Sequence, residues 1–249
     1  MVTSLDWLSE QIRQPIDAAT PAIVRALAGQ LIAVCLIGPA AKRGRSLRGT
    51  HAELLIVAET LDTARLRELA RGLAQPLRAG LQVRTVTRTE LAGSVDVQAL
   101  DIATWRDHHL LLAGSDPFVG LEIAAKDLRH EIERALRTLT QRLRNRMLWC
   151  LATEQVRLDA LLREGMELLT MIGHHTLALV GQRPPRDEAA LLGRLLAWCG
   201  TSVAPVAPMV MALRSRLEAT RAPDDPLAEL AALATTTEAV CARVDALRV

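Results

Sequence analysis

The stretch that decides the fold is residues 31–59, LIAVCLIGPAAKRGRSLRGTHAELLIVAE, where two apolar runs flank a turn that contains glycine and many cations. The runs, at 31–37 and 52–58, are short, dominated by aliphatic side chains and separated by the polar turn. This pattern is typical of strands that are buried on both faces. The sequence therefore predicts two neighbouring strands joined by a long basic turn.

The turn, residues 38–50, contains four basic residues and no acidic residue. The basic residues are Lys42, Arg43, Arg45 and Arg48. Because guanidinium and ammonium groups donate strong hydrogen bonds to phosphate oxygens, we expect the turn to attract an anion. The candidate anion-binding residues at this position are Gly38, Lys42, Arg43, Arg45 and His51.

The second run opens with two side chains that can bear chemistry, His51 and Glu53. Residues two apart on a strand project from the same face, and both lie at the end nearest the basic turn. Two ligands at this spacing could share one metal ion, so Glu53 is a candidate metal ligand.

This arrangement resembles the nucleotidyltransferase superfamily of the DNA polymerase beta type, whose signature is Gly-Ser after one strand and Asp-x-Asp at the start of the next. The matching residues here are Gly38-Pro39 and His51-Ala52-Glu53. Pro39 replaces the serine and His51 replaces the first carboxylate, so only Glu53 fits unaltered. In that superfamily the paired carboxylates hold magnesium against a triphosphate, whereas neutral imidazole is a poor magnesium ligand. The resemblance therefore implies a degenerate active-site motif.

The resemblance also implies a third carboxylate on a neighbouring strand. Residues 95–102, VDVQALDI, follow another strand-like run at 81–87, so they are interpreted as a strand that offers Asp96 and Asp101. These two are five residues apart and would face opposite sides of a regular strand, so at most one completes the site. We favour Asp101, because it lies near the strand end, where sites in open sheets collect.

The order of elements favours two domains, a nucleotidyltransferase-like α/β domain at 1–115 and a helical bundle at 116–249, and thus an α+β protein. Helices are expected in the first domain near residues 4–14, 20–29 and 62–78. Beyond residue 117 apolar residues recur every three or four positions, which is the helical period. The helices predicted there lie near residues 128–147, 154–180, 187–199, 207–221 and 227–247.

Composition limits the partners and the cellular compartment that we expect for this protein. A formal net charge of +2 gives no strong field, so we expect neither a nucleic acid nor a membrane as partner. The four cysteines are isolated in apolar surroundings, and no N-terminal segment resembles a secretory signal, which indicates a reduced, cytoplasmic protein. Half of the residues are hydrophobic, which suggests an apolar surface covered by a protein partner or by a second copy.

Three functional hypotheses follow. The first is a non-catalytic nucleotidyltransferase-like module that binds nucleotide or phosphate, or that regulates a partner. The second is an active magnesium-dependent enzyme that moves a nucleoside monophosphate to a small molecule or a protein. In that case Glu53 and Asp101 would be the catalytic metal ligands, and Arg43 and Arg45 would contact the phosphates of a nucleoside triphosphate. The third is a purely structural protein that dimerises through its helical domain.

Overall fold

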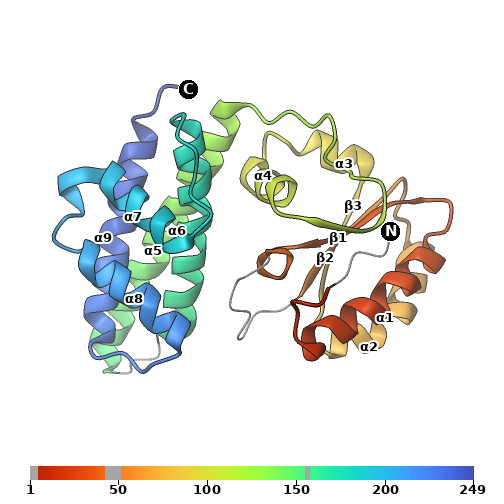
Figure 1. The fold of residues 1–249 in the computed structure, drawn as a ribbon, viewed down its shortest axis with the longest axis horizontal. Helices are drawn as coiled ribbons and strands as arrows, with labels where there is room; N and C mark the ends of the chain where they lie inside the picture. The colour runs from red at the N-terminus through yellow and green to blue at the C-terminus, as the bar shows by residue number, and fades with distance from the viewer. Residues whose placement is uncertain (1–4, 43–51, 155–157) are drawn as a thin grey trace. The chain divides into compact units, whose positions relative to one another are not determined.

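The structure is a computed structural model that describes residues 5–42, 52–154 and 158–249. The chain forms two compact units, residues 1–123 and 124–249 (Figure 1). The first contains a small mixed sheet with helices and the second is helical, so the α+β class predicted from the sequence is confirmed. The first unit extends through Ile123 rather than ending at residue 115, because Phe118 is buried against the sheet.

Four strands of the described residues form one sheet in the order β3-β2-β1-β4. The strands are β1 (Leu31–Ile37), β2 (Glu53–Ala58), β3 (Gln82–Thr87) and β4 (Leu110–Gly114). Strand β1 is antiparallel to β2 and β4, whereas β2 and β3 are parallel. The predicted pairing of the two apolar runs is confirmed, because β1 and β2 are hydrogen-bonded neighbours at the centre of the sheet.

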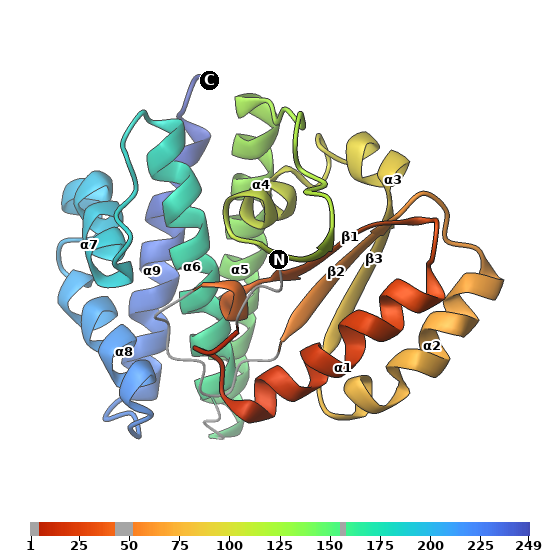
Figure 2. The same cartoon turned by 45° about the vertical axis from the view of Figure 1, so that its right-hand side comes forward.

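Helices cover both faces of the sheet. One face packs against α1 (Glu10–Ala26) and α2 (Thr63–Arg78), which lie side by side (Figure 2). The other face packs against α3 (Arg88–Gly93) and α4 (Ala99–Asp107). Because side chains alternate along a strand, Leu54 of β2 joins the first layer and Leu55 joins the second. Glu53 therefore projects from the α3/α4 face, at the end of β2.

The N-terminal segment differs from the prediction. The sequence predicts helices near residues 4–14 and 20–29, whereas the structure has the single helix α1, which contains Pro21 in its interior. Thr20, expected to cap the second helix, instead donates its hydroxyl to the carbonyl oxygen of Ile16 at 2.9 Å. The apolar stripe that begins at Ile16 continues through this region and is fully buried, so packing against the sheet outweighs the low helix propensity of proline.

The strand predicted at residues 95–102 is wrong. Helix α4 begins at Ala99, and the residues just before it form a turn. The helical period brings Ala99, Ile102 and Trp105 into the buried layer, where the latter two pack against the sheet. A short apolar stretch of this kind fits a strand or a buried helix equally well, and the tertiary contacts decide between them. The fourth strand is β4, which lies after this helix.

The second unit contains the five helices that the sequence predicts, with some ends shifted by several residues. They are α5 (Ala125–Thr153), α6 (Asp159–Leu179), α7 (Glu188–Cys199), α8 (Ala207–Ala219) and α9 (Pro226–Asp245). Arg216 of α8 contacts two other helices of this unit. Its Nε donates a hydrogen bond to Oε1 of Glu229 at 2.6 Å, and its Nη1 donates one to Oδ1 of Asp159 at 3.1 Å. This partly buried guanidinium holds α8 against both α9 and α6.

The four cysteines are buried free thiols, as predicted. Burial, with a smaller contribution from the charge of Asp116, raises the pKa of Cys35 to about 12. Burial raises the pKa of Cys199 to about 11. Both remain neutral thiols, which are poor nucleophiles and poor metal ligands. None of the helices in the described parts of the chain combines the length and the apolar character needed to cross a bilayer.

Candidate functional site

The first half of the candidate site lies where β1 ends beside the start of β2. Ile37, the last residue of β1, pairs with Glu53, the first residue of β2. Gly38 follows with a φ of +71°, a left-handed conformation that favours glycine, and a short 3-10 helix spans Pro39–Ala41. A β-carbon at position 38 would lie 3.6 Å from Oε2 of Glu53. The glycine therefore brings the backbone of the turn next to this carboxylate.

The second half of the site comes from β3. In the parallel register Glu53 aligns with Gln82, and Leu55 aligns with Arg84. Aligned residues of neighbouring strands share a face of the sheet, so Arg84 projects from the same face as Glu53. Its Nε donates a hydrogen bond to Oε1 of Glu53, and the two side chains form an ion pair. Glu53 has an exposed side-chain fraction of only 19%, so this pair is partly shielded from water.

The surroundings keep Arg84 charged. Burial acts to lower its pKa, but the hydrogen bond to Glu53 and the charges of Glu53 and Asp101 outweigh that effect, so the pKa of Arg84 is raised above its ordinary value. The guanidinium also lies 5.5 Å from the ring centroid of Trp105, on α4. A permanent cation therefore lies beside the carboxylate of Glu53 and the indole of Trp105 on the α3/α4 face of the sheet.

The structure places the predicted site residues as follows. Asp101 lies in the first turn of α4, not on a strand, and its negative charge contributes to raising the pKa of Arg84. Asp96 is exposed in the turn that precedes α4. Lys42 is half-buried just after the 3-10 helix. Arg43, Arg45, Arg48 and His51 lie outside the described residues.

The carboxylate of Glu53, as it is paired in this structure, does not fit a magnesium ion. Magnesium requires several oxygen ligands in near-octahedral geometry. Here a guanidinium hydrogen-bonds the one carboxylate that matches the superfamily motif, and the same guanidinium interacts with the charge of Asp101. A divalent cation beside Glu53 would have to displace Arg84 or share the carboxylate with it, and the two positive charges would repel each other.

Sequence reasoning missed Arg84. The signal that could have identified it is the alternation of residues 81–87, which puts Arg84 on one face with Val86. That alternation alone does not reveal which strand lies next to β3, nor whether the pair is parallel. Only the register of β3 on β2 shows that the side chain faces Glu53.

A small mixed sheet, with a glycine turn beside an acidic residue at the start of the next strand, precedes a helical bundle, and this α+β arrangement is a nucleotidyltransferase-like fold. The structure is similar to spectinomycin adenyltransferase AAD(9) from Enterococcus faecialis, solved with ATP and spectinomycin, with 9% identity over 92% of this chain and 98% of that chain and a TM-score of 0.58. At this identity the likeness shows the fold alone. No family model and no curated protein matches the sequence.

Proposed function

We propose that this protein is a nucleotidyltransferase-like module without transfer activity, which binds the phosphates of a nucleotide without a metal ion. The observation that carries the proposal is the ion pair between Glu53 and Arg84. In an active member of the superfamily, carboxylates at this place hold the metal that organises an in-line displacement. Here a fixed cation supplies the positive charge instead, and it cannot activate or exchange ligands as a metal does.

Two further features support the phosphate-binding part of the proposal. The turn at 38–50 contains four basic residues and no acidic residue, which suits the negative charge of a di- or triphosphate. The structurally similar adenyltransferase was solved with ATP. A guanidinium in place of a magnesium ion would leave phosphate binding possible while removing the group that drives transfer.

The test is a thermal-shift titration of the full chain with ATP, GTP and inorganic tripolyphosphate, each in EDTA and in magnesium chloride. A ligand that binds only the folded state raises the melting temperature by mass action. We expect ATP to stabilise the protein equally in both buffers. The chain contains only two lysines, which gives a matched pair of variants: Lys42→Ala should weaken the shift, and Lys126→Ala, in the helical unit, should not.

A parallel assay follows label from alpha-labelled ATP and GTP into protein and small-molecule acceptors. We expect no incorporation above that of a boiled sample. Magnesium-dependent incorporation that Glu53→Ala abolishes would overturn the proposal in favour of the active enzyme. If none of the three phosphate ligands changes the melting temperature at millimolar concentration, the purely structural interaction hypothesis replaces it.

A further inference from the structure

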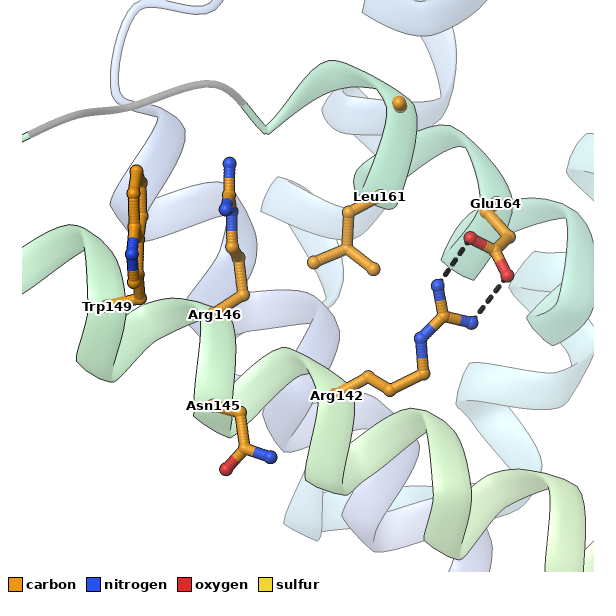
Figure 3. Close-up of a pocket in the computed structure, with 7 residues that line it drawn as sticks. Arg142, Asn145, Arg146, Trp149, Leu161 and Glu164 are labelled. Atoms are coloured by element: carbon orange, nitrogen blue, oxygen red, sulfur yellow. Dashed lines mark hydrogen bonds and ion pairs between the residues drawn. The ribbon is translucent and has the colours of Figure 1, made fainter.

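The outer face of α2 carries arginines whose charge is not neutralised by a neighbour. Arg67, Arg71 and Arg78 are exposed, and none of them makes an ion pair or a side-chain hydrogen bond with any residue that the structure describes. The open groove between α5 and α6 shows the contrary case, because Arg142 there holds Glu164 through two hydrogen bonds (Figure 3). The three arginines of α2 therefore carry positive charge that is available to a partner.

These three arginines form one row along α2. Successive members are four and seven residues apart, so at about 100° per residue they fall within about 40° of one another around the helix axis. At a rise of about 1.5 Å per residue the row is about 17 Å long. The buried residues of the helix, Leu69, Leu73 and Pro76, lie on the opposite side. The row therefore points away from the core of the sheet unit.

A second row, of apolar side chains, runs beside the arginines. Leu66, Ala70 and Leu77 each precede one arginine, so they repeat the same spacing about 100° further around the helix. Both leucines have exposed fractions of 44%, and Ala70 is exposed as well. Helix α1 covers another side of α2, because a β-carbon at Gly72 would lie 3.2 Å from that of Ala22. The apolar row is therefore turned away from α1, which lies along one flank of α2 (Figure 2).

The charge of this face selects an anionic partner. Helix α2 contains four arginines and a single acidic residue, Glu68. Glu68 lies on the other side of the arginine row from the leucines, so it does not separate the two rows. A second copy that docked through the same face would place its arginine row against this one, which like-charge repulsion disfavours. A partner that bears carboxylates or phosphates complements the face.

The pattern of the two rows favours a helix over a nucleic acid or a membrane. A nucleic-acid duplex or a bilayer would extend over the neighbouring helix α1, whose two acidic and two basic residues leave it without net charge. Neither α1 nor α2 contains an aromatic side chain on which a base could stack. Apolar side chains flanked by a row of like charges at helical spacing are the arrangement by which paired helices recognise each other.

We propose that the outer face of α2 binds an acidic amphipathic helix of another protein. Aliphatic side chains of that helix pack on Leu66 and Leu77, and its carboxylates pair with the arginine row. Helix α2 covers the face of the sheet opposite the Glu53–Arg84 cluster, so the proposal does not depend on the nucleotide hypothesis.

The test uses a fluorescein-labelled synthetic helix of about 18 residues, long enough to be helical, with a row of leucines beside a row of glutamates. A second peptide carries lysine in place of every glutamate, and a third has the composition of the first in scrambled order. Binding to the full chain is followed by fluorescence anisotropy. We expect saturable binding of the acidic helix that salt weakens, and at least about tenfold weaker binding of the other two peptides.

Two double variants locate the binding site. Arg67→Glu with Arg71→Glu reverses the charge of the row and should weaken binding of the acidic helix by about tenfold or more. Leu66→Gln with Leu77→Gln leaves the charges in place and should also weaken it by about tenfold, because the apolar contact is lost. All four positions are exposed, so each variant should fold, and its melting temperature checks this.

The matched control is Arg186→Glu with Arg248→Glu. These two arginines belong to the helical unit, are exposed and likewise make no ion pair with the described residues. The control changes the net charge of the protein by the same amount as the α2 charge variant. It should leave binding of the acidic helix unchanged.

Several results would overturn the proposal. These are a lack of saturable binding at millimolar peptide, equal binding of the acidic helix and its scrambled form, full binding by either α2 variant, and an equal loss in the control. Tighter binding of an RNA duplex or of phosphatidylserine vesicles, abolished by the α2 charge variant, would assign the face to that polyanion. A dimer of the wild-type chain that the leucine variant dissociates in sedimentation would assign it to a second copy.

Discussion

Replacing Arg84 with alanine should destabilise the sheet unit slightly and create a weak site for a divalent cation. The change removes the guanidinium that hydrogen-bonds Glu53 and interacts with the charge of Asp101. The carboxylate of Glu53 then remains on the α3/α4 face without its cation, at the position that the superfamily uses for a metal ligand. Carboxylate oxygens in this situation are suitable ligands for magnesium or manganese.

The expected loss of stability follows from the solvent exposure of the two paired side chains. Solvent-exposed ion pairs contribute about 0.2–1 kcal/mol. The side chain of Arg84 is 51% exposed and that of Glu53 only 19%, so the loss should fall near the upper end of that range, about 1 kcal/mol. For a chain of this size that is a decrease in melting temperature of roughly 3 °C. A cation present at ten times its dissociation constant should restore about 1.4 kcal/mol.

The assay is differential scanning fluorimetry of wild type and Arg84→Ala, in EDTA and across a series of magnesium and manganese concentrations. The control is Arg88→Ala, which removes the ion pair of 2.9 Å between Arg88 and Glu59 beyond the far end of β2. This control should show a small loss and no response to cations. The reasoning is refuted if wild type and Arg84→Ala are stabilised equally by the cation, because Arg84 would then not occupy the cation position.

Three further predictions concern folding. Pro21→Ala should raise the free energy of unfolding by about 1–2 kcal/mol in urea, because it restores a hydrogen bond inside α1; a decrease would show that packing requires the proline. Leu55→Ala, at a fully buried position, should lower the free energy of unfolding by about 2–5 kcal/mol. A negligible loss would contradict the assignment of Leu55 to the core. The hydrogen bond from Arg142 lowers the pKa of Glu164 below its ordinary value of 4.5, so the pair stabilises the fold above that pH and loses its contribution as the pH falls through the lowered value. Arg142→Ala should therefore cost about 0.3 kcal/mol at neutral pH and nothing in strong acid, and an equal cost at both would contradict the ion pair.

Much of the fold can be predicted from local sequence patterns. The run LIAVCLI and the apolar residues after Glu53 have no alternation of polar and apolar side chains, because both faces of the central strands are covered. The helical period predicts the five α-helices that the structure describes in the second unit, since each buries one stripe. The errors occur at two places. In α1 the prolines are compatible with one helix or with two, and at α4 the short apolar stretch is compatible with a strand or with a buried helix.

Only part of the candidate site could be predicted from the sequence. The glycine turn and Glu53 are close along the chain, so strand pairing alone brings them together. Asp101, whose charge contributes to raising the pKa of Arg84, lies on a helix that the sequence does not distinguish from a strand. The role of His51, Arg43 and Arg45 stays a prediction, because these residues lie outside the described parts of the chain.

The sequence by itself determined the two apolar strands and the division into a sheet unit and a helical unit, because these depend on residues that are neighbours in the chain. Only the tertiary structure decided that Arg84 pairs with Glu53, because that contact depends on β3 lying parallel to β2 in one particular register. Shifting that register by a single residue would turn the guanidinium to the opposite face of the sheet.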